Sequence, residues 1–178
     1  AQYRVPVVVA NLVGGADSLV YYGGSFAVDG SGDLLGRAAY FQEQTLPVDT
    51  DGLDKRPVGP ELDPLEALWG ALVPGTRDFV HKCGFRKVVL GLSGGVDSAL
   101  VALIAAEAFG PENVTSLLMP SPYSSKGSVD DAMALAAALD INAHVVPIDG
   151  ILEANAKTFG SVFIEGLRGL AEENTQAR

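Results

Sequence analysis

The feature that constrains the fold most is a glycine-rich segment between a short apolar run and a helix-forming stretch. Residues 91–98 (GLSGGVDS) follow the apolar run 88–90 and lead directly into the apolar stretch 99–109. This order predicts a strand, a tight loop and a helix. Adjacent glycines permit backbone dihedrals that side chains forbid, and they leave amide groups open to an anion at the helix N-terminus. The segment therefore predicts a phosphate-binding loop.

This loop differs from a Walker A motif because it has no lysine. The sequence between Lys87 and Lys126 contains none, whereas a Walker A loop requires Gly-Lys-Ser/Thr after its glycines. We expect phosphate to be bound by amides and by the hydroxyls of Ser93 and Ser98, with Asp97 as the charge beside it. A carboxylate at a phosphate site requires a cation between the two, and Mg²⁺ is commonly held by carboxylates and phosphate oxygens. Asp97 is therefore the candidate Mg²⁺ ligand.

A plainer interpretation of the same residues stays open. Ser, Gly and Asp are also the usual residues of turns and helix N-caps. On this interpretation Gly94 and Gly95 only turn the chain, and Asp97 only caps the helix.

Length and composition exclude several classes of function. The 178 residues, 48% of them hydrophobic, suffice for one domain and part of another. The net charge of −10, without a cluster of Lys and Arg, argues against nucleic acid as a partner. The single cysteine, Cys83, fits a reducing compartment. Nothing at the N-terminus resembles a signal peptide, and no apolar run reaches the roughly 18 residues that a membrane span needs. We expect a soluble, cytoplasmic protein.

The second half of the sequence predicts a parallel α/β unit. Strands are expected at 88–92, 114–119 and 143–148, and helices at 99–109, 128–139 and 152–163. Short connections in this alternation are typical of a parallel sheet with right-handed crossovers. Such sheets bind ligands beyond the carboxyl ends of their strands, where the glycine loop lies. We interpret His144 as a packed strand residue and Cys83 as an inert, packed thiol.

The first half is β-rich and then irregular. Residues 5–10 predict a buried strand, and the turn at 29–33 predicts a hairpin. Residues 46–59 have no apolar period and predict a linker. A helix is expected from Pro64 to about residue 84, with Asp63 as N-cap and a kink or a break at Pro74-Gly75.

Several motifs together resemble the glutamine-dependent NAD⁺ synthetases. Residues 93–98 (SGGVDS) resemble the pyrophosphate loop of the N-type ATP pyrophosphatases, which cut ATP between its α and β phosphates. Residues 119–125 (MPSPYSS) and 173–178 (ENTQAR) resemble the NAD⁺ synthetases in particular. Residues 11–26 resemble the end of the nitrilase-type glutaminase domain that is fused to them.

The resemblance implies a domain organisation and a reaction. It implies that residues 1–48 are the C-terminal part of a nitrilase-like α/β sandwich, 49–62 a linker, and 63–178 the first part of a Rossmann-like synthetase domain of the adenine nucleotide alpha hydrolase type. The implied reaction is adenylation of deamido-NAD⁺ by ATP, followed by displacement of AMP by ammonia from glutamine. The amidase Glu, Lys and Cys are expected upstream of Ala1, and further synthetase residues beyond Arg178. We therefore expect a part of a longer, homo-oligomeric enzyme.

The resemblance also implies roles for individual residues. Those expected to bind ATP are Gly91, Leu92, Ser93, Gly94, Gly95, Val96, Asp97, Ser98 and Met119. Asp97 is expected to bind Mg²⁺, and Asn174 and Arg178 to contact deamido-NAD⁺. Two alternatives stay open. One is another N-type ATP pyrophosphatase, such as a GMP, asparagine or argininosuccinate synthetase or a tRNA-thiolating enzyme, and the other is an inactive ATP-binding module.

Overall fold

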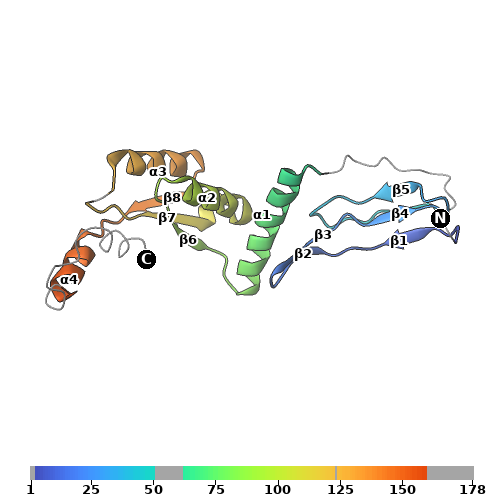
Figure 1. The fold of residues 1–178 in the computed structure, drawn as a ribbon, viewed down its shortest axis with the longest axis horizontal. Helices are drawn as coiled ribbons and strands as arrows, with labels where there is room; N and C mark the ends of the chain where they lie inside the picture. Colours follow the sequence, from blue (N-terminus) through green and yellow to red (C-terminus); the bar gives the residue numbers. More distant parts are fainter. Residues whose placement is uncertain (1–2, 51–61, 123, 160–178) are drawn as a thin grey trace. The chain divides into compact units, whose positions relative to one another are not determined.

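The structure of the protein is a computed structural model that describes residues 3–50, 62–122 and 124–159. The chain divides into two units, residues 1–86 and 87–178 (Figure 1). Most of the predicted linker and the end of the predicted helix 152–163 lie outside the described residues. The domain boundaries at 49–62 therefore stay a prediction.

The N-terminal unit contains two antiparallel β structures and one long helix. A sheet in the order β1-β4-β5 is formed by β1 (Val7–Val9), β4 (Phe26–Val28) and β5 (Leu34–Arg37), and a hairpin by β2 (Val13–Ala16) and β3 (Leu19–Tyr22). The predicted turn joins β4 to β5. An Asp29 carboxylate oxygen accepts hydrogen bonds from the N–H groups of Ser31 (2.8 Å) and Asp33 (2.9 Å), which fixes this turn.

The prediction of a buried strand at residues 5–10 is wrong in two respects. The strand covers Val7–Val9, and Val8 is 61% exposed. Among the described strands β1 pairs with β4 alone, so it lies at the edge of its sheet. The β-branched run predicted the extended backbone, but it carries no information about what covers the strand.

Helix α1 (Pro64–Lys82) runs through Pro74 without a break. Its predicted N-cap is confirmed, since an Asp63 carboxylate oxygen accepts from the Leu65 N–H at 2.8 Å. The prediction is a kink or a break, and of the two the break does not occur, although proline removes one helical hydrogen bond and crowds the carbonyl four residues earlier. Pro74 is buried, and α1 packs against β2 and β3. We attribute the continuity of the helix to this packing.

The C-terminal unit is a three-stranded parallel sheet with helices between its strands. Its elements are β6 (Val88–Gly91), α2 (Val96–Phe109), the 3₁₀ turn Pro111–Asn113, β7 (Val114–Leu118), α3 (Lys126–Ala138), β8 (Asn142–Val145) and α4 (Asp149–Phe159). The strand order is β6-β7-β8, with α2 packed on β6 and β7, and α3 on β7 and β8 (Figure 1). The predicted α/β fold with a parallel sheet is confirmed.

The core of this unit lies between the sheet and the two helices that cover it. Buried apolar side chains come from both layers: Leu92, Ala102, Ala105, Ala108, Phe109, Val114, Leu118, Ala132, Ala136 and Ile141. Ser116 is fully buried among them, and its hydroxyl donates to the Asn142 carbonyl at 3.0 Å. This bond compensates for the desolvation of the hydroxyl.

Several element bounds in this unit differ from the predictions, among them the start of α4, which lies at Asp149 rather than at residue 152. Helix α2 begins at Val96 rather than at residue 99, and β8 covers Asn142–Val145 rather than 143–148. Helix α3 begins at Lys126, because Ser125 is its N-cap and accepts from the Ser128 N–H at 3.1 Å. The predicted start at Ser128 placed acidic residues in the first turn, and this is wrong.

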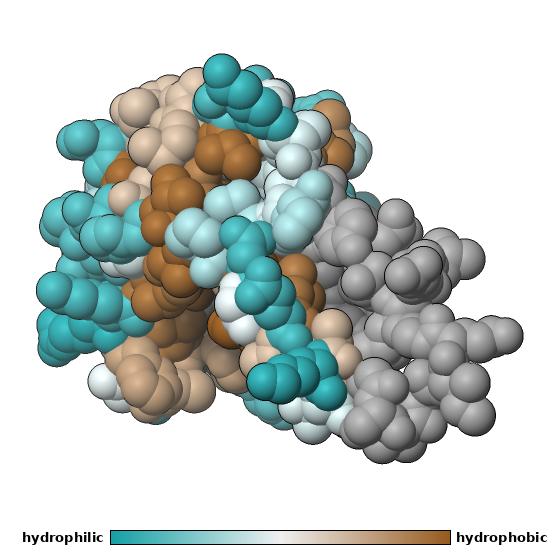
Figure 2. Space-filling view, turned by 90° about the vertical axis from the view of Figure 1, so that its left-hand side faces the viewer, coloured by the Kyte–Doolittle hydropathy of each residue, from teal (hydrophilic) through white to brown (hydrophobic). Residues whose placement is uncertain are grey.

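The predicted packing of two side chains is also wrong. His144 lies in β8 as predicted but is exposed, and so is Cys83. Apolar side chains also remain at the surface of this sheet, where Val89 is 66% exposed. The face seen in Figure 2 carries a band of apolar residues between hydrophilic ones. Within the described ranges, no helix combines the length and the apolar character needed to cross a bilayer.

A substitution in the core tests this packing. Leu118 is 2% exposed, so Leu118→Ala should lower the free energy of unfolding by about 2–5 kcal/mol, because it removes buried methyl groups and leaves a cavity. Val89→Ala, at an exposed position of the neighbouring strand, should cost no more than roughly 0.5 kcal/mol. Urea denaturation of both variants measures the difference. Equal losses would contradict the described core.

Candidate functional site

A cavity of about 390 Å³ lies where the three parallel strands end. Backbone pairing continues beyond the strands around it. The Leu92 N–H donates to the Leu117 carbonyl at 3.0 Å, and the Val146 N–H donates to the Leu118 carbonyl at 2.7 Å. The Ile148 N–H donates to the carbonyl of Pro120, in the segment after β7, at 3.1 Å. These bonds hold the segments after β6, β7 and β8 together at the edge of the sheet.

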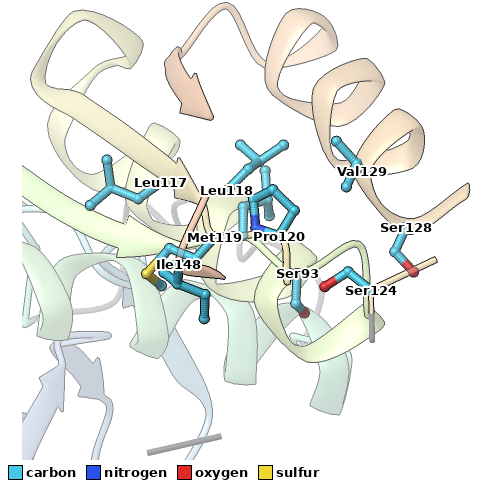
Figure 3. A pocket seen from close by; sticks show the side chains of 11 residues that line it. Ser93, Leu117, Leu118, Met119, Pro120, Ser124, Ser128, Val129 and Ile148 are labelled. Carbon is cyan, nitrogen blue, oxygen red and sulfur yellow. The ribbon is translucent and has the colours of Figure 1, made fainter. Parts of the chain in front are cut away.

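The cavity has an apolar side and a hydroxyl-bearing side. Its lining consists of Gly91, Leu92, Ser93, Leu117, Leu118, Met119, Pro120, Ser124, Ser128, Val129 and Ile148. Figure 3 shows Met119 and Ile148 on one side and the hydroxyls of Ser93 and Ser124 on the other. An apolar pocket with a few polar groups at one end is the usual form of a small-molecule site.

The glycine loop contacts the start of α3 closely at Gly94. Gly94 has a φ of 80°, in the region that side chains disfavour. A Cβ at this position would lie 2.3 Å from the Ser128 carbonyl oxygen. Both observations require glycine here, and they show that the loop packs directly against the first turn of α3.

Gly95 has a different reason to be glycine. Its φ of −86° and ψ of 158° are extended backbone that any residue adopts, so of the two adjacent glycines only Gly94 takes dihedrals that side chains disfavour. Gly95 is the N-cap of α2, and as a glycine it has no side chain to cap the helix. The first N–H groups of a helix have no intrahelical acceptor. The amides of Val96 and Asp97 are thus accessible to an anion.

The two serines of the loop are bonded to the loop itself. The Ser98 hydroxyl donates to the Gly95 carbonyl at 2.9 Å, and the two serine hydroxyl oxygens, of Ser93 and Ser98, lie 3.1 Å apart. The Gly95 N–H donates to the Ser93 hydroxyl oxygen at 3.3 Å. In this structure the hydroxyls shape the loop, and their role as phosphate donors stays a prediction. The N–H groups of Val96 and Asp97, which as the first of the helix have no intrahelical acceptor, are the candidate anion donors.

Asp97 lies in the first turn of α2 and is exposed. In the part of the chain that the structure describes, no three His, Cys, Asp or Glu side chains gather in a way that could hold a metal ion. One carboxylate together with phosphate oxygens and water is a common set of Mg²⁺ ligands. The residue present therefore fits Mg²⁺ that arrives with a nucleotide, and its role as a ligand stays a prediction.

The other predicted site residues divide into two groups. Met119 lies at the cavity, with its methyl carbon 3.4 Å from the position that a Cβ on Gly91 would take. It thus joins residues 91–98 at one edge of the sheet. Asn174 and Arg178 lie outside the described residues.

The sequence interpretation missed the contribution of α3 and of the segment after β8. Ser128 and Val129 line the cavity from the first turn of α3, and Ile148 does so from the segment after β8. The available signal was topological, since segments that follow parallel strands meet at one edge.

The fold and the cavity together define a parallel α/β unit with a candidate small-molecule site at the carboxyl edge of its sheet. The family model described as NAD synthase matches residues 68–178. The chain belongs to the NAD synthase family, which confirms the resemblance drawn from residues 93–98 and 119–125.

Two relatives extend the similarity to the residues before the matched segment. The chain is 47% identical over 99% of its length to the glutamine-dependent NAD⁺ synthetase of Synechocystis, and covers 33% of that protein. It is 39% identical over 99% of its length to the enzyme of the same name from Thermotoga maritima, and covers 37% of it. The chain thus spans about a third of the length of these relatives.

Solved structures agree with this placement. A glutamine-dependent NAD⁺ synthetase from Acinetobacter baumannii, in complex with ADP, matches with a TM-score of 0.91 and 35% identity. The match covers 99% of this chain and 34% of the other. A glutamine-dependent NAD⁺ synthetase from Cytophaga hutchinsonii matches with a TM-score of 0.80 at 19% identity, over 98% of this chain and 36% of the other. The second match shows the fold alone.

The two glycines should respond differently to alanine. Gly94→Ala should lower the free energy of unfolding by more than the roughly 1–2 kcal/mol that a left-handed residue costs, because its Cβ also meets the Ser128 carbonyl oxygen. Gly95→Ala should stay within roughly 0.5 kcal/mol of the unmodified protein, since its nearest neighbour is the Ser93 hydroxyl oxygen at 3.4 Å. Urea denaturation measures both. Equal destabilisation by the two changes would overturn the loop geometry.

Proposed function

We propose that this chain is part of a glutamine-dependent NAD⁺ synthetase. In the proposed reaction ATP adenylates the nicotinate carboxylate of deamido-NAD⁺ with release of diphosphate. Ammonia from glutamine then displaces AMP and forms the amide of NAD⁺. The similarity to glutamine-dependent relatives over both units supports this proposal, because the residues before the synthetase segment are included in it.

The observation that carries the proposal is the open N-terminus of α2 behind Gly95. Amides at a helix N-terminus, together with the partial positive charge of the helix dipole, bind phosphate groups. We place the ATP phosphates against residues 94–98 and the adenine on the apolar side, near Met119 and Ile148. The cavity of about 390 Å³ is within the usual range for a ligand pocket. The ADP complex of the Acinetobacter baumannii relative supports a nucleotide at this fold.

We propose that Asp97 supplies one carboxylate ligand for Mg²⁺ bound with the ATP. When bound, Mg²⁺ neutralises charge on the triphosphate and makes its α-phosphorus a better electrophile. Asp97 itself orients the ion, and the helix amides fix the phosphate oxygens. The protein thus acts on the nucleotide mainly by positioning and electrostatics.

The remaining parts of the reaction are assigned to other regions of the protein. We propose that Asn174 and Arg178 contact deamido-NAD⁺, and that residues 1–48 belong to the end of the glutaminase domain. The amidase Glu, Lys and Cys triad is expected upstream of Ala1. We propose a reducing, cytoplasmic environment for the enzyme, since Cys83 is the single cysteine of these 178 residues and they contain no disulfide framework.

We propose that the enzyme is a homo-oligomer. Helix α2 exposes large apolar side chains outward, among them Leu100 (47% exposed) and Val101 (53% exposed). Contiguous exposed apolar surface often marks a protein interface. Multi-angle light scattering of the whole protein should give a mass above that of one chain.

Substrate-dependent release of AMP separates the proposal from its two alternatives. The whole protein, given [α-³²P]ATP, should form labelled AMP when deamido-NAD⁺ and ammonia are added. Release that depends on another acceptor would favour a different N-type ATP pyrophosphatase. Nucleotide binding without any release would favour an inactive module.

Replacing the proposed metal ligand should remove activity and leave the fold intact. Asp97→Asn in the whole protein, with ammonia supplied directly, should lower the rate of NAD⁺ formation by about 10²-fold or more, the usual cost of losing one electrostatic contact to the transition state. Because Asp97 is exposed in the first turn of α2, the free energy of unfolding should change by no more than about 1 kcal/mol. NAD⁺ formation and the circular dichroism melting curve measure the two quantities.

A matched control removes a different exposed carboxylate of the same unit. Glu153→Gln, on α4, should leave the rate unchanged. A rate near normal for Asp97→Asn would refute its assignment as a metal ligand.

A further inference from the structure

Two charged side chains of α1 bind the two backbone groups of one hairpin residue. The Asp78 carboxylate accepts the Gly15 N–H at 2.8 Å, and the Lys82 ammonium donates to the Gly15 carbonyl. Asp78 and Lys82 are four positions apart and therefore share one face of the helix. The Arg77 guanidinium lies 3.6 Å from the other Asp78 oxygen. Gly15 is thus held from both sides by charge-assisted hydrogen bonds.

Glycines on both elements allow this close approach. A Cβ on Gly14, which has a φ of 112°, would lie 2.8 Å from an Asp78 carboxylate oxygen. A Cβ on Gly15 would lie 3.3 Å from the Cα of Gly75, and a Cβ on Gly75 would lie 2.8 Å from a methyl carbon of Val20. Glycine inside a helix costs stability relative to alanine. Its presence at this contact is explained by the packing of α1 against the hairpin.

The contact joins α1, most of which lies inside the NAD synthase match, to a hairpin that precedes the match. The NAD synthase match begins at residue 68, inside α1, whereas Gly15 precedes the match. The same helix leads through residues 83–87 into β6, the strand that ends in the glycine loop. Asp78 and Lys82 therefore tie the opening helix of the synthetase segment to the hairpin that precedes it.

We propose that Asp78 and Lys82 are positioning residues that fix α1 to the β2–β3 hairpin and thereby make the use of glutamine nitrogen efficient. This inference rests on the proposed function. Ammonia made from glutamine has to reach the synthetase site before it escapes to water, whereas ammonia added to the solution does not depend on that transfer. Loss of the Asp78 or the Lys82 hydrogen bond to Gly15 should therefore lower the amount of NAD⁺ formed per glutamine hydrolysed. The rate with added ammonia should stay unchanged.

The test uses the whole protein with Asp78→Ala or Lys82→Met. Loss of one charge-assisted hydrogen bond lowers the ratio of molecules in which α1 is fixed to the hairpin to those in which it is not by roughly tenfold. We expect the NAD⁺ formed per glutamine hydrolysed to fall severalfold, while kcat with ammonia stays unchanged. Hydrogen exchange at the Gly15 amide should accelerate in Asp78→Ala. Lys82→Arg should restore the yield, since arginine also donates to a carbonyl.

Two control substitutions distinguish loss of the hydrogen bonds to Gly15 from the general effect of removing a positive charge. Arg77→Ala removes the neighbouring ion pair and retains the Gly15 bonds, and Lys87→Met removes an exposed lysine outside the helix. Both should keep the full yield. Parallel loss with glutamine and ammonia, or an unchanged yield in both variants, would overturn the positioning role. Absence of NAD⁺ formation from ammonia by the unmodified protein would instead refute the proposed function on which it rests.

Discussion

The proposed nucleotide site depends on the contact between Gly94 and the backbone of Ser128. This contact, which only glycine permits, places the loop after β6 against the first turn of α3. The same cavity is therefore lined by residues from both elements, with Ser93 on one and Ser128 on the other. Because protein interiors are close-packed, a change at this point moves one wall of the cavity relative to the other.

The rest of the C-terminal unit supports this contact with backbone hydrogen bonds. Pairing continues past the ends of the strands, through the Leu92 and Val146 N–H groups, so backbone hydrogen bonds also hold the segments that follow the strands. Small side chains such as Ala102 and Ala132 let α2 and α3 lie close to the sheet. The loop thus projects from a rigid edge, which is the arrangement that preorganised anion binding requires.

The sequence predicted the order of elements and the loop, because both depend on local patterns. The apolar run before Gly91 and the glycines after it are such patterns, and the parallel sheet follows from the alternation of elements. It did not predict that Gly95 is extended while Gly94 is not, since that difference arises from the contact with Ser128. Likewise, Pro74 stays helical because of packing on the hairpin, and the exposure of His144 depends on what covers the sheet. These are tertiary effects that a single sequence does not encode locally.

A structure of the whole protein with Mg²⁺ and an ATP analogue that has a methylene group between its α and β phosphorus atoms tests the central claim most directly. The account predicts that the phosphates lie against the amides of residues 94–98, with the metal at Asp97. It also predicts the adenine on the apolar side of the cavity, near Met119 and Ile148. A triphosphate bound elsewhere, without contact to the N-terminus of α2, would contradict the account.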